Sequence, residues 1–273
     1  MFQSVKPRSN LHSAISIAER IYHAVVRDIR KGHRNAFMAL LMNILTAVIM
    51  VMAFYLMFTL LGIRGIKLRG DFLLYMMSGI FLFLTHIKTL GAVVGAEGPA
   101  SPMMQHAPMN TVISITAGAI SALYIQTLSM LIILFIYDVA FNPISIHQPV
   151  PAFGMFLLAW FTGLAAGLVL VAMKPWFPAF VGIFTTIYQR ANMIASGKMF
   201  VANTLPPFML AMFDWNPLFH AIDQARGFTF INYFPHNSSV EYPIIVGVVL
   251  LIVGMMGEFY TRQYASQSWA ARQ

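Results

Sequence analysis

The chain has 273 residues, of which 59% are hydrophobic and only 10% are charged. Soluble domains carry about 25% charged residues, so this composition predicts an integral membrane protein. The complete lack of cysteine excludes disulfides, thiolate metal sites and a cysteine nucleophile. The net charge is +8, but seven of the 17 Lys and Arg residues precede residue 35 and most others flank apolar segments. That distribution is typical of cytoplasmic membrane loops and argues against a nucleic-acid partner.

The first 35 residues predict an amphipathic helix on the cytoplasmic side of a membrane. From Leu11 to Ile29 apolar residues recur at steps of three and four, while basic residues occupy other faces. A basic helix of modest hydrophobicity suits the headgroup region. A calmodulin-target helix or a mitochondrial presequence has a similar pattern, but the uncharged stretch that follows favours the interfacial position. No signal peptide is recognisable, and we expect a cytoplasmic N-terminus.

Apolar segments after residue 35 are long enough to cross a bilayer. A spanning helix needs about 20 mostly apolar residues, and the first of these segments carries no charge at all. Seven Lys and Arg residues precede it and three follow it, which places the N-terminus inside. The sequence predicts an all-α membrane protein with six transmembrane helices and both chain ends in the cytoplasm. The predicted spans are 36–63, 72–96, 111–137, 152–173, 179–195 and 241–260.

A polar segment framed by prolines, residues 97–110, separates the second and third predicted spans. Its three prolines exclude a straight continuous helix, and it is longer than the usual helix connection. We expect a cytoplasmic elbow here, and a plain loop is the alternative. The candidate functional residues in the segment are Glu97, Pro99, Pro102, Gln105 and His106.

Residues 196–240, between the fifth and sixth predicted spans, are punctuated by polar residues and prolines. The apolar piece from Met199 to Phe213 is too short to cross a bilayer. We therefore expect two short re-entrant helices. Asp214 or Asn216 would cap the second helix, and Pro217 would fill its first turn. Irregular backbone at membrane depth must be covered by protein or line a watery path, so a gate and a static plug are both open interpretations.

The residue patterns of membrane-embedded catalysis are missing from the sequence. There is no HExxH zinc pair and no Asp-x-Asp site, and the nine acidic residues are scattered singly, so no metal site is expected. Ser196, Gly197 and Lys198 lack the flanking residues of a phosphate-binding loop. The central parts of the predicted spans carry no acid, which favours energy from an ATPase partner over an ion gradient. A relay built from Lys, His or hydroxyl groups stays open.

Two pairs of glycines lie four residues apart, each on one face of a predicted helix. Gly91 with Gly95, and Gly163 with Gly167, allow two helices to approach closely. Ordinary packing within one subunit and a dimer interface both explain such pairs. The aromatic residues, 14% of the chain, predict membrane anchoring and core packing, and some of them would suit stacking on sugars.

The most specific feature of the chain lies between residues 196 and 226. It resembles the periplasmic re-entrant region of the ABC-2 permease family, in the branch that exports bacterial capsular polysaccharides and O-antigens. Asp223 departs from the family pattern, in which Glu is the commoner acid. The residues that carry the resemblance are Ser196, Gly197, Phe200, Leu205, Pro206, Asn216, Pro217, Leu218, His220, Asp223 and Arg226.

The resemblance implies a single ABC-2 transmembrane domain over residues 1–273, in the bacterial inner membrane. The chain would be a permease without enzymatic activity or a cofactor of its own, paired with a second copy and with two ABC ATPase subunits that bind ATP and Mg²⁺. Segment 97–110 would be the coupling helix that docks on the ATPase. Within the domain, residues 1–35 would form the interfacial helix, 36–195 the first five spans, 196–240 the external gate, and 241–273 the last span and the tail.

The substrate that the resemblance implies is a lipid-linked polysaccharide, with capsular polysaccharide preferred. The alternatives are an O-antigen exporter, an ABC-2 exporter of small molecules or lipids, and a scaffold subunit without a gate. Periplasmic or outer-membrane export components and membrane lipids are further expected partners. Arg190, Lys198 and Arg226 would contact anionic sugars or lipid phosphates, unless Arg226 pairs with Asp223. The expected gate residues are Ser196, Gly197, Pro206, Asn216, Pro217, Asp223 and Arg226.

Overall fold

The computed structural model describes residues 10–31, 35–60, 71–96 and 111–264. Over these ranges the regular elements are α-helices and one short 3₁₀ turn, η2, with no strand. In chain order they are α1 (Asn10–Lys31), α2 (Ala36–Leu60), α3 (Phe72–Val94), α4 (Thr111–Ala140), α5 (Pro149–Met173), α6 (Pro178–Ala195), η2 (Ala202–Thr204), α7 (Pro207–Leu210), α8 (Pro217–Thr229) and α9 (Glu241–Tyr264).

Five of these helices are long and apolar enough to cross a membrane, which makes the chain an all-α, multi-pass membrane protein, as its composition predicts. The fifth predicted span, α6, has 18 residues and is not among the five. Its C-terminal half contains Arg190 and Asn192, which lower its apolar character. A sixth span therefore stays a prediction. The five helices are α2, α3, α4, α5 and α9.

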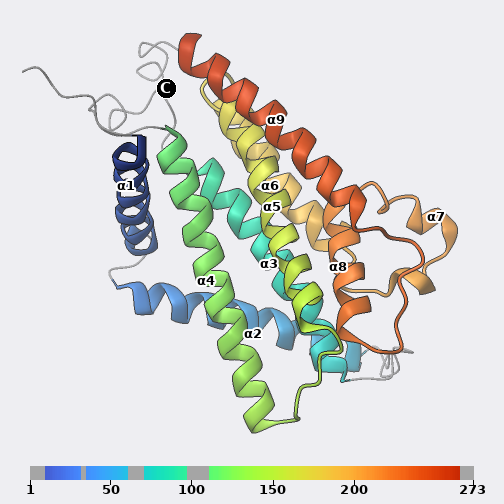
Figure 1. The fold of residues 1–273 in the computed structure, drawn as a ribbon. Helices are drawn as coiled ribbons and strands as arrows, with labels where there is room; N and C mark the ends of the chain where they lie inside the picture. The colour runs from blue at the N-terminus through green and yellow to red at the C-terminus, as the bar shows by residue number, and fades with distance from the viewer. Residues whose placement is uncertain (1–9, 32–34, 61–70, 97–110, 265–273) are drawn as a thin grey trace, which may run out of the picture.

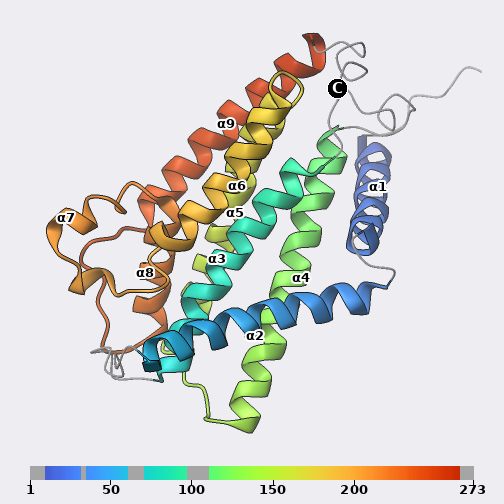
Figure 2. The same cartoon turned by 180° about the vertical axis from the view of Figure 1, so that it is seen from behind.

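Helices α3 and α5 form the centre of the bundle, and α4 and α9 lie on opposite sides of this pair (Figures 1 and 2). In an apolar stretch of 18 residues, 67% of α3 and 61% of α5 is buried. The buried side chains are mainly large and apolar, among them Ile80, Phe83 and Phe156. The short helix α8 packs against the same two helices. The core is thus built around α3 and α5.

Glycines bring these central helices close together. A Cβ atom at Gly163 of α5 would lie 2.5 Å from the carbonyl oxygen of His86 on α3, and one at Gly167 would lie 2.9 Å from Cβ of Val93. On α9, a Cβ at Gly247 would lie 2.5 Å from the Phe161 ring of α5. The Gly163 and Gly167 pair therefore serves packing within the subunit. Such close approach is the usual role of small residues in membrane helices.

The N-terminal helices flank this core. Helix α1 forms over the range that the apolar spacing predicts, and it lies alongside α4 (Figures 1 and 2), where Ala24 packs with Ile113 and Ala117. Helix α2 crosses the other long helices at a steep angle instead of running beside them (Figures 1 and 2). Only 22% of an apolar stretch of 18 residues in α2 is buried. The interfacial position of α1 is not tested by this packing and stays a prediction.

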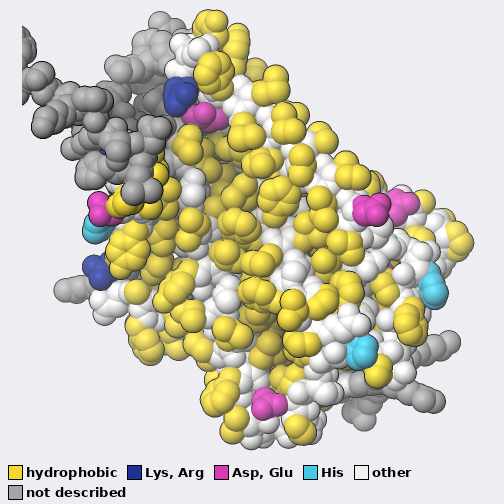
Figure 3. All heavy atoms as spheres, in the orientation of Figure 1, with side chains coloured by type: hydrophobic (Ala, Val, Ile, Leu, Met, Phe, Trp, Pro, Cys, Tyr) yellow, Lys and Arg dark blue, Asp and Glu magenta, His cyan; other side chains and the backbone are white. Residues whose placement is uncertain are grey.

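Apolar side chains cover most of the face that α4, α5 and α9 present (Figure 3). Charged side chains on this face gather toward its edges (Figure 3). Large exposed apolar residues occur along the outward sides of α2 and α9, such as Leu56 at 53% and Met256 at 68% exposed. A soluble monomer rarely exposes so extended an apolar surface. Lipid contact over these helices accounts for it.

Candidate functional site

The polar residues that the sequence singles out lie mostly in the α8 region, residues 196–240, which connects α6 to α9. Here the chain forms a tight turn after α6, then η2, α7 and the buried helix α8, and returns through a loop to α9. In Figure 1 the α7 segment projects from the side of the bundle, whereas α8 lies against it. The region contains all the expected gate residues.

Arg226 on α8 is only 1% exposed and binds the turn after α6. Its Nη1 donates to the carbonyl oxygens of Gly197 at 2.9 Å and of Phe200 at 2.8 Å. Its Nη2 donates to the carbonyl of Lys198 at 2.7 Å. The guanidinium carbon also lies 4.1 Å from the ring centroid of Tyr75 on α3. Hydrogen bonds from a charged donor are roughly twice as strong as neutral ones, so Arg226 fixes this turn onto α8 and α3.

Two glycines allow the turn to pack this closely. Gly197 has a φ of +74°, in the left-handed region that favours glycine, and a Cβ atom there would lie 2.6 Å from Cδ2 of Phe219. On α3, a Cβ at Gly79 would lie 2.9 Å from Nη2 of Arg226 and equally close to Cβ of Lys198. The geometry of the turn thus gives a structural reason for Gly197.

Asn216 and Pro217 begin α8 as the sequence predicts. The Oδ1 atom of Asn216 accepts a hydrogen bond from the backbone N–H of Leu218 at 3.0 Å, and Pro217 occupies the first turn. The Nδ2 group of Asn216 donates to Oδ1 of Asn192 at 2.9 Å and to the carbonyl of Ala195 at 3.0 Å. The predicted cap is confirmed, and Asn216 also ties α8 to the end of α6.

Asp223 does not form an ion pair with Arg226. Its Oδ1 accepts a hydrogen bond from the hydroxyl of Tyr233, and its Oδ2 accepts one from Ser238 Oγ at 2.7 Å. Its neighbour His220 accepts from the backbone N–H of Ser239 at 3.0 Å. The predicted alternative of an Asp223–Arg226 pair is therefore absent from the structure, because each side chain is engaged elsewhere. Asp223 instead holds the loop that leads to α9.

Lys198 and Ser196 lie in the same turn, and each is buried. In the described part of the chain, Lys198 Nζ and Ser196 Oγ have no hydrogen-bond partner. The Nζ atom lies 3.2 Å from the ring centroid of Phe83 and 5.2 Å from that of Phe54. Burial lowers the pKa of Lys198 to about 7, and the ring faces offset part of the cost of the charge. A substrate reaches this group only if the turn moves.

The remaining expected contacts are exposed. Arg190 lies on the surface of α6, and Pro206 immediately precedes α7. The apolar piece 199–213 forms η2 and the four-residue α7. These are two short helical segments rather than one, because Pro206 and Pro207 lack the backbone N–H that a continuous helix needs. That they re-enter the membrane stays a prediction. The expected coupling residues Glu97, Pro99, Pro102, Gln105 and His106 lie outside the described residues.

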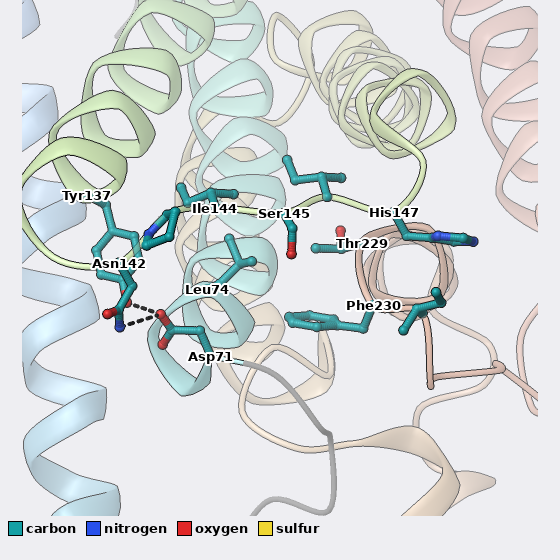
Figure 4. A pocket seen from close by; sticks show the side chains of 12 residues that line it. Asp71, Leu74, Tyr137, Asn142, Ile144, Ser145, His147, Thr229 and Phe230 are labelled. Atoms are coloured by element: carbon teal, nitrogen blue, oxygen red, sulfur yellow. Dashed lines mark hydrogen bonds between the residues drawn. The ribbon is translucent and has the colours of Figure 1, made fainter.

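An outer cavity of about 430 Å³ opens where α8 ends, and sequence reasoning missed it (Figure 4). Its walls are the start of α3, the loop 141–148 and the end of α8. Asp71 accepts hydrogen bonds from the Tyr137 hydroxyl and, at 3.3 Å, from the Asn142 amide. The ring of Phe230 lines the same space (Figure 4). Carboxylate, amide and ring groups together are suited to sugar hydroxyls and CH faces, but they come from segments far apart in the sequence.

An inner cavity of about 410 Å³ lies between α1, α2, α3 and α4. Lys88, Asn43, Gln126 and Asp28 provide most of its polar lining. Gln126 Nε2 donates to Asn43 Oδ1 at 3.0 Å, and Asn43 Nδ2 donates to Ser129 Oγ at 2.8 Å. Sequence reasoning searched the spans for acids and so passed over Lys88. The available signal was a single Lys in a span that is otherwise free of Asp, Glu, Lys and Arg.

Neither cavity has the donor set of a metal site. Within the described ranges, no group of three or more His, Cys, Asp or Glu side chains converges closely enough to hold a metal ion. The side chains that line the two cavities offer hydrogen bonding, ring faces and charge.

The chain matches no protein-family model, and it matches no curated protein sequence. The likeness to polysaccharide-export permeases therefore rests on residues 196–226 and on the order of the helices. Function follows as a proposal from these residues and from the geometry around them.

Proposed function

We propose that the chain is the transmembrane permease subunit of an ATP-driven ABC exporter that moves a lipid-linked polysaccharide, with capsular polysaccharide preferred, across the bacterial inner membrane. Its partners are a second copy of the chain, two ABC ATPase subunits that bind ATP and Mg²⁺, and further export components. Both chain ends are cytoplasmic in this proposal. The permease itself carries out no chemistry.

The observation that supports this proposal best is the α8 region. Helix α8 has 13 residues, too few to cross a bilayer, yet most of it is buried among the long helices. Irregular backbone with polar side chains is tolerated at membrane depth only where protein or a watery path covers it. The eleven residues that carry the family resemblance lie in and around this helix. A buried, non-spanning helix before the last long helix is the arrangement expected of a re-entrant gate.

In the proposed topology α6 completes a set of six spans, and the outer cavity faces the periplasm. Segment 97–110 forms the coupling helix on the opposite side. ATP-driven closure of the partner subunits moves this segment and shifts the packed spans. The α8 region then opens as a gate, and the glycan passes outward between the two copies of the chain.

The test is the glycan profile of a strain from which the gene for this chain is deleted. Capsule, O-antigen and lipid-linked precursors are measured separately, at the surface and inside the cell. We expect one surface polymer to disappear while its lipid-linked precursor accumulates, with restoration by a plasmid copy. Loss of O-antigen alone would reassign the polymer. An unchanged profile would overturn polysaccharide export and favour an ABC-2 exporter of small molecules or lipids.

A further inference from the structure

Lys88 is a charged residue within a membrane-spanning helix. It lies on α3, six residues before the last residue Val94, which is about 9 Å along a helix axis. Its side chain is exposed, and no described residue forms an ion pair with it. Ionisable groups inside membrane helices are costly and usually face a cavity with a functional partner. Lys88 faces the inner cavity.

The amide groups of the inner cavity complement this charge. Asn43 is 9% exposed and Gln126 is 5% exposed, and they bond to each other across α2 and α4. Each side-chain amide nitrogen carries two hydrogens. One hydrogen of Gln126 goes to Asn43, and one of Asn43 goes to Ser129. No described group accepts the second hydrogen of either amide, and both side chains line the cavity. The cavity therefore combines one ammonium group with N–H donors.

The acid in the cavity is partly offset by a neighbouring base. Asp28 of α1 lines the space, and its Oδ1 lies 3.8 Å from Nε of Arg27. The charged side chains that line the cavity are therefore one base, Lys88, and one acid, Asp28, with Arg27 beside the acid. The rest of the lining is apolar and includes Met42 and Ile125. An ammonium group and amide donors beside apolar walls are suited to an anionic head joined to a hydrocarbon chain.

We propose that the inner cavity binds the phosphate or diphosphate group of a lipid, with Lys88 as the principal contact. A lysine ammonium binds phosphate as a point charge, and the amide hydrogens of Asn43 and Gln126 donate to the remaining oxygens. In the proposed topology the cavity faces the cytoplasmic half of the bilayer. The lipid is either the polyprenyl carrier of the glycan, which rests on the proposed function, or a membrane phospholipid, which does not.

The full-length protein in neutral detergent micelles provides the test. Binding of farnesyl diphosphate, dioctanoyl phosphatidylglycerol and inorganic pyrophosphate is measured by calorimetry. The variant Lys88→Gln removes the charge, Lys88→Arg keeps it, and Asp28→Asn removes the acid. Arg262→Gln, on the exposed last turn of α9, removes the same charge elsewhere. Monodispersity and melting temperature of each variant are recorded, so that misfolding is not read as lost binding.

We expect Lys88→Gln to weaken binding of a phosphate lipid by at least about tenfold, the usual scale for one hydrogen bond to a charged group. Lys88→Arg and Arg262→Gln should bind within about twofold of the parent chain, and Asp28→Asn should bind as tightly or more tightly. Preference for farnesyl diphosphate indicates the glycan carrier, and equal binding of the phosphatidylglycerol indicates a general lipid site. Equal binding by Lys88→Gln, or equal loss in Lys88→Gln and Asp28→Asn, would overturn the proposal, as would pyrophosphate binding alone.

The two proposals fail separately. If lipid binding depends on Lys88 but deletion of the gene changes no glycan, the lipid site stays in place and polysaccharide export is overturned. Suppose instead that deletion removes a surface glycan, that a plasmid copy of Lys88→Gln fully restores it, and that this variant binds lipid as the parent chain does. That result would leave export in place and overturn the lipid site.

Discussion

The α8 region and the inner cavity each place a basic side chain inside an apolar bundle, but they treat its charge differently. Arg226 donates three hydrogen bonds to backbone carbonyls, and its side chain is only 1% exposed. No described residue forms an ion pair with Lys88, and its side chain lines the inner cavity. A charge that the protein's own backbone satisfies is used for structure. A charge left facing a cavity is available to a ligand.

The largest expected effect comes from removing the satisfied charge. Arg226→Met removes the guanidinium donor from three carbonyl oxygens of the turn after α6, and should lower the free energy of unfolding by at least about 3 kcal/mol. Arg226→Lys should recover only part of this, because an ammonium group lacks the planar fork of donors. The measurement is an SDS-induced unfolding titration in mixed micelles. Stability within about 0.5 kcal/mol of the parent chain would remove Arg226 from this structural role.

A smaller loss is expected from the turn itself. Gly197→Ala forces a residue with a Cβ into a φ of +74° and against Phe219, which should cost about 2 kcal/mol in the same titration. Gly182→Ala on α6 is the matched control, because a Cβ there meets nothing within 4 Å. It should be neutral or slightly stabilising, since alanine favours helices over glycine. Equal effects of the two substitutions would contradict the tight packing of the turn.

Lys198 is buried like Arg226, but its Nζ has no hydrogen-bond partner in the described part of the chain. The pH dependence of stability distinguishes it from the other two residues. Its folded-state pKa is lowered to about 7, whereas an unfolded lysine titrates near 10.4. Between these values the unfolded chain binds a proton that the folded chain lacks, so stability should rise with pH above 7, by at most about 1.4 kcal/mol per pH unit. Lys198→Met should remove this contribution. Parallel pH profiles of the two proteins between pH 7 and 9 would rule it out.

The smallest effect on stability is expected for Lys88→Gln. Because no folded-state ion pair is lost, the free energy of unfolding should change by less than about 0.5 kcal/mol. The measurement is the same SDS titration, without added lipid. If Lys88→Gln lowers the free energy of unfolding as much as Arg226→Met does, the two regions do not differ in this respect and Lys88 is a structural residue.

Much of the fold follows from hydrophobic length alone. The uncharged stretch 36–63 predicts α2, and a Pro after a capping Asn predicts the start of α8 at Pro217. The length of the apolar piece 199–213 predicts a short helix, but Pro206 and Pro207 divide its helical structure into η2 and α7. Helix crossing directions, such as that of α2, depend on packing partners and are not encoded in the period of one segment.

The candidate site was predictable where its residues are neighbours in sequence. Asn216 and Pro217 act locally, so their roles could be inferred. The partners of Arg226 are carbonyl groups of residues about 26 to 29 positions away, and a backbone acceptor leaves no residue-type signal. Asp223 accepts a hydrogen bond from the hydroxyl of Tyr233, ten residues later. Its role was also not predictable, because an aromatic residue in a membrane protein is equally expected as an anchor. The inner cavity joins side chains from four helices, which only a folded structure brings together.

The close approach of α5 to both α3 and α9 bears on how the molecule moves. A Cβ at Gly254 of α9 would lie 2.8 Å from Leu168 of α5, much as Gly163 excludes one beside His86. Sliding these helices past one another would drive side chains into backbone. Amide hydrogen exchange should therefore show α3, α5 and α9 opening together as one slow cooperative unit. Helix α2 contains no glycine and crosses the other long helices at a steep angle. It should therefore exchange first, and a conformational change would disrupt the fewest contacts along that helix.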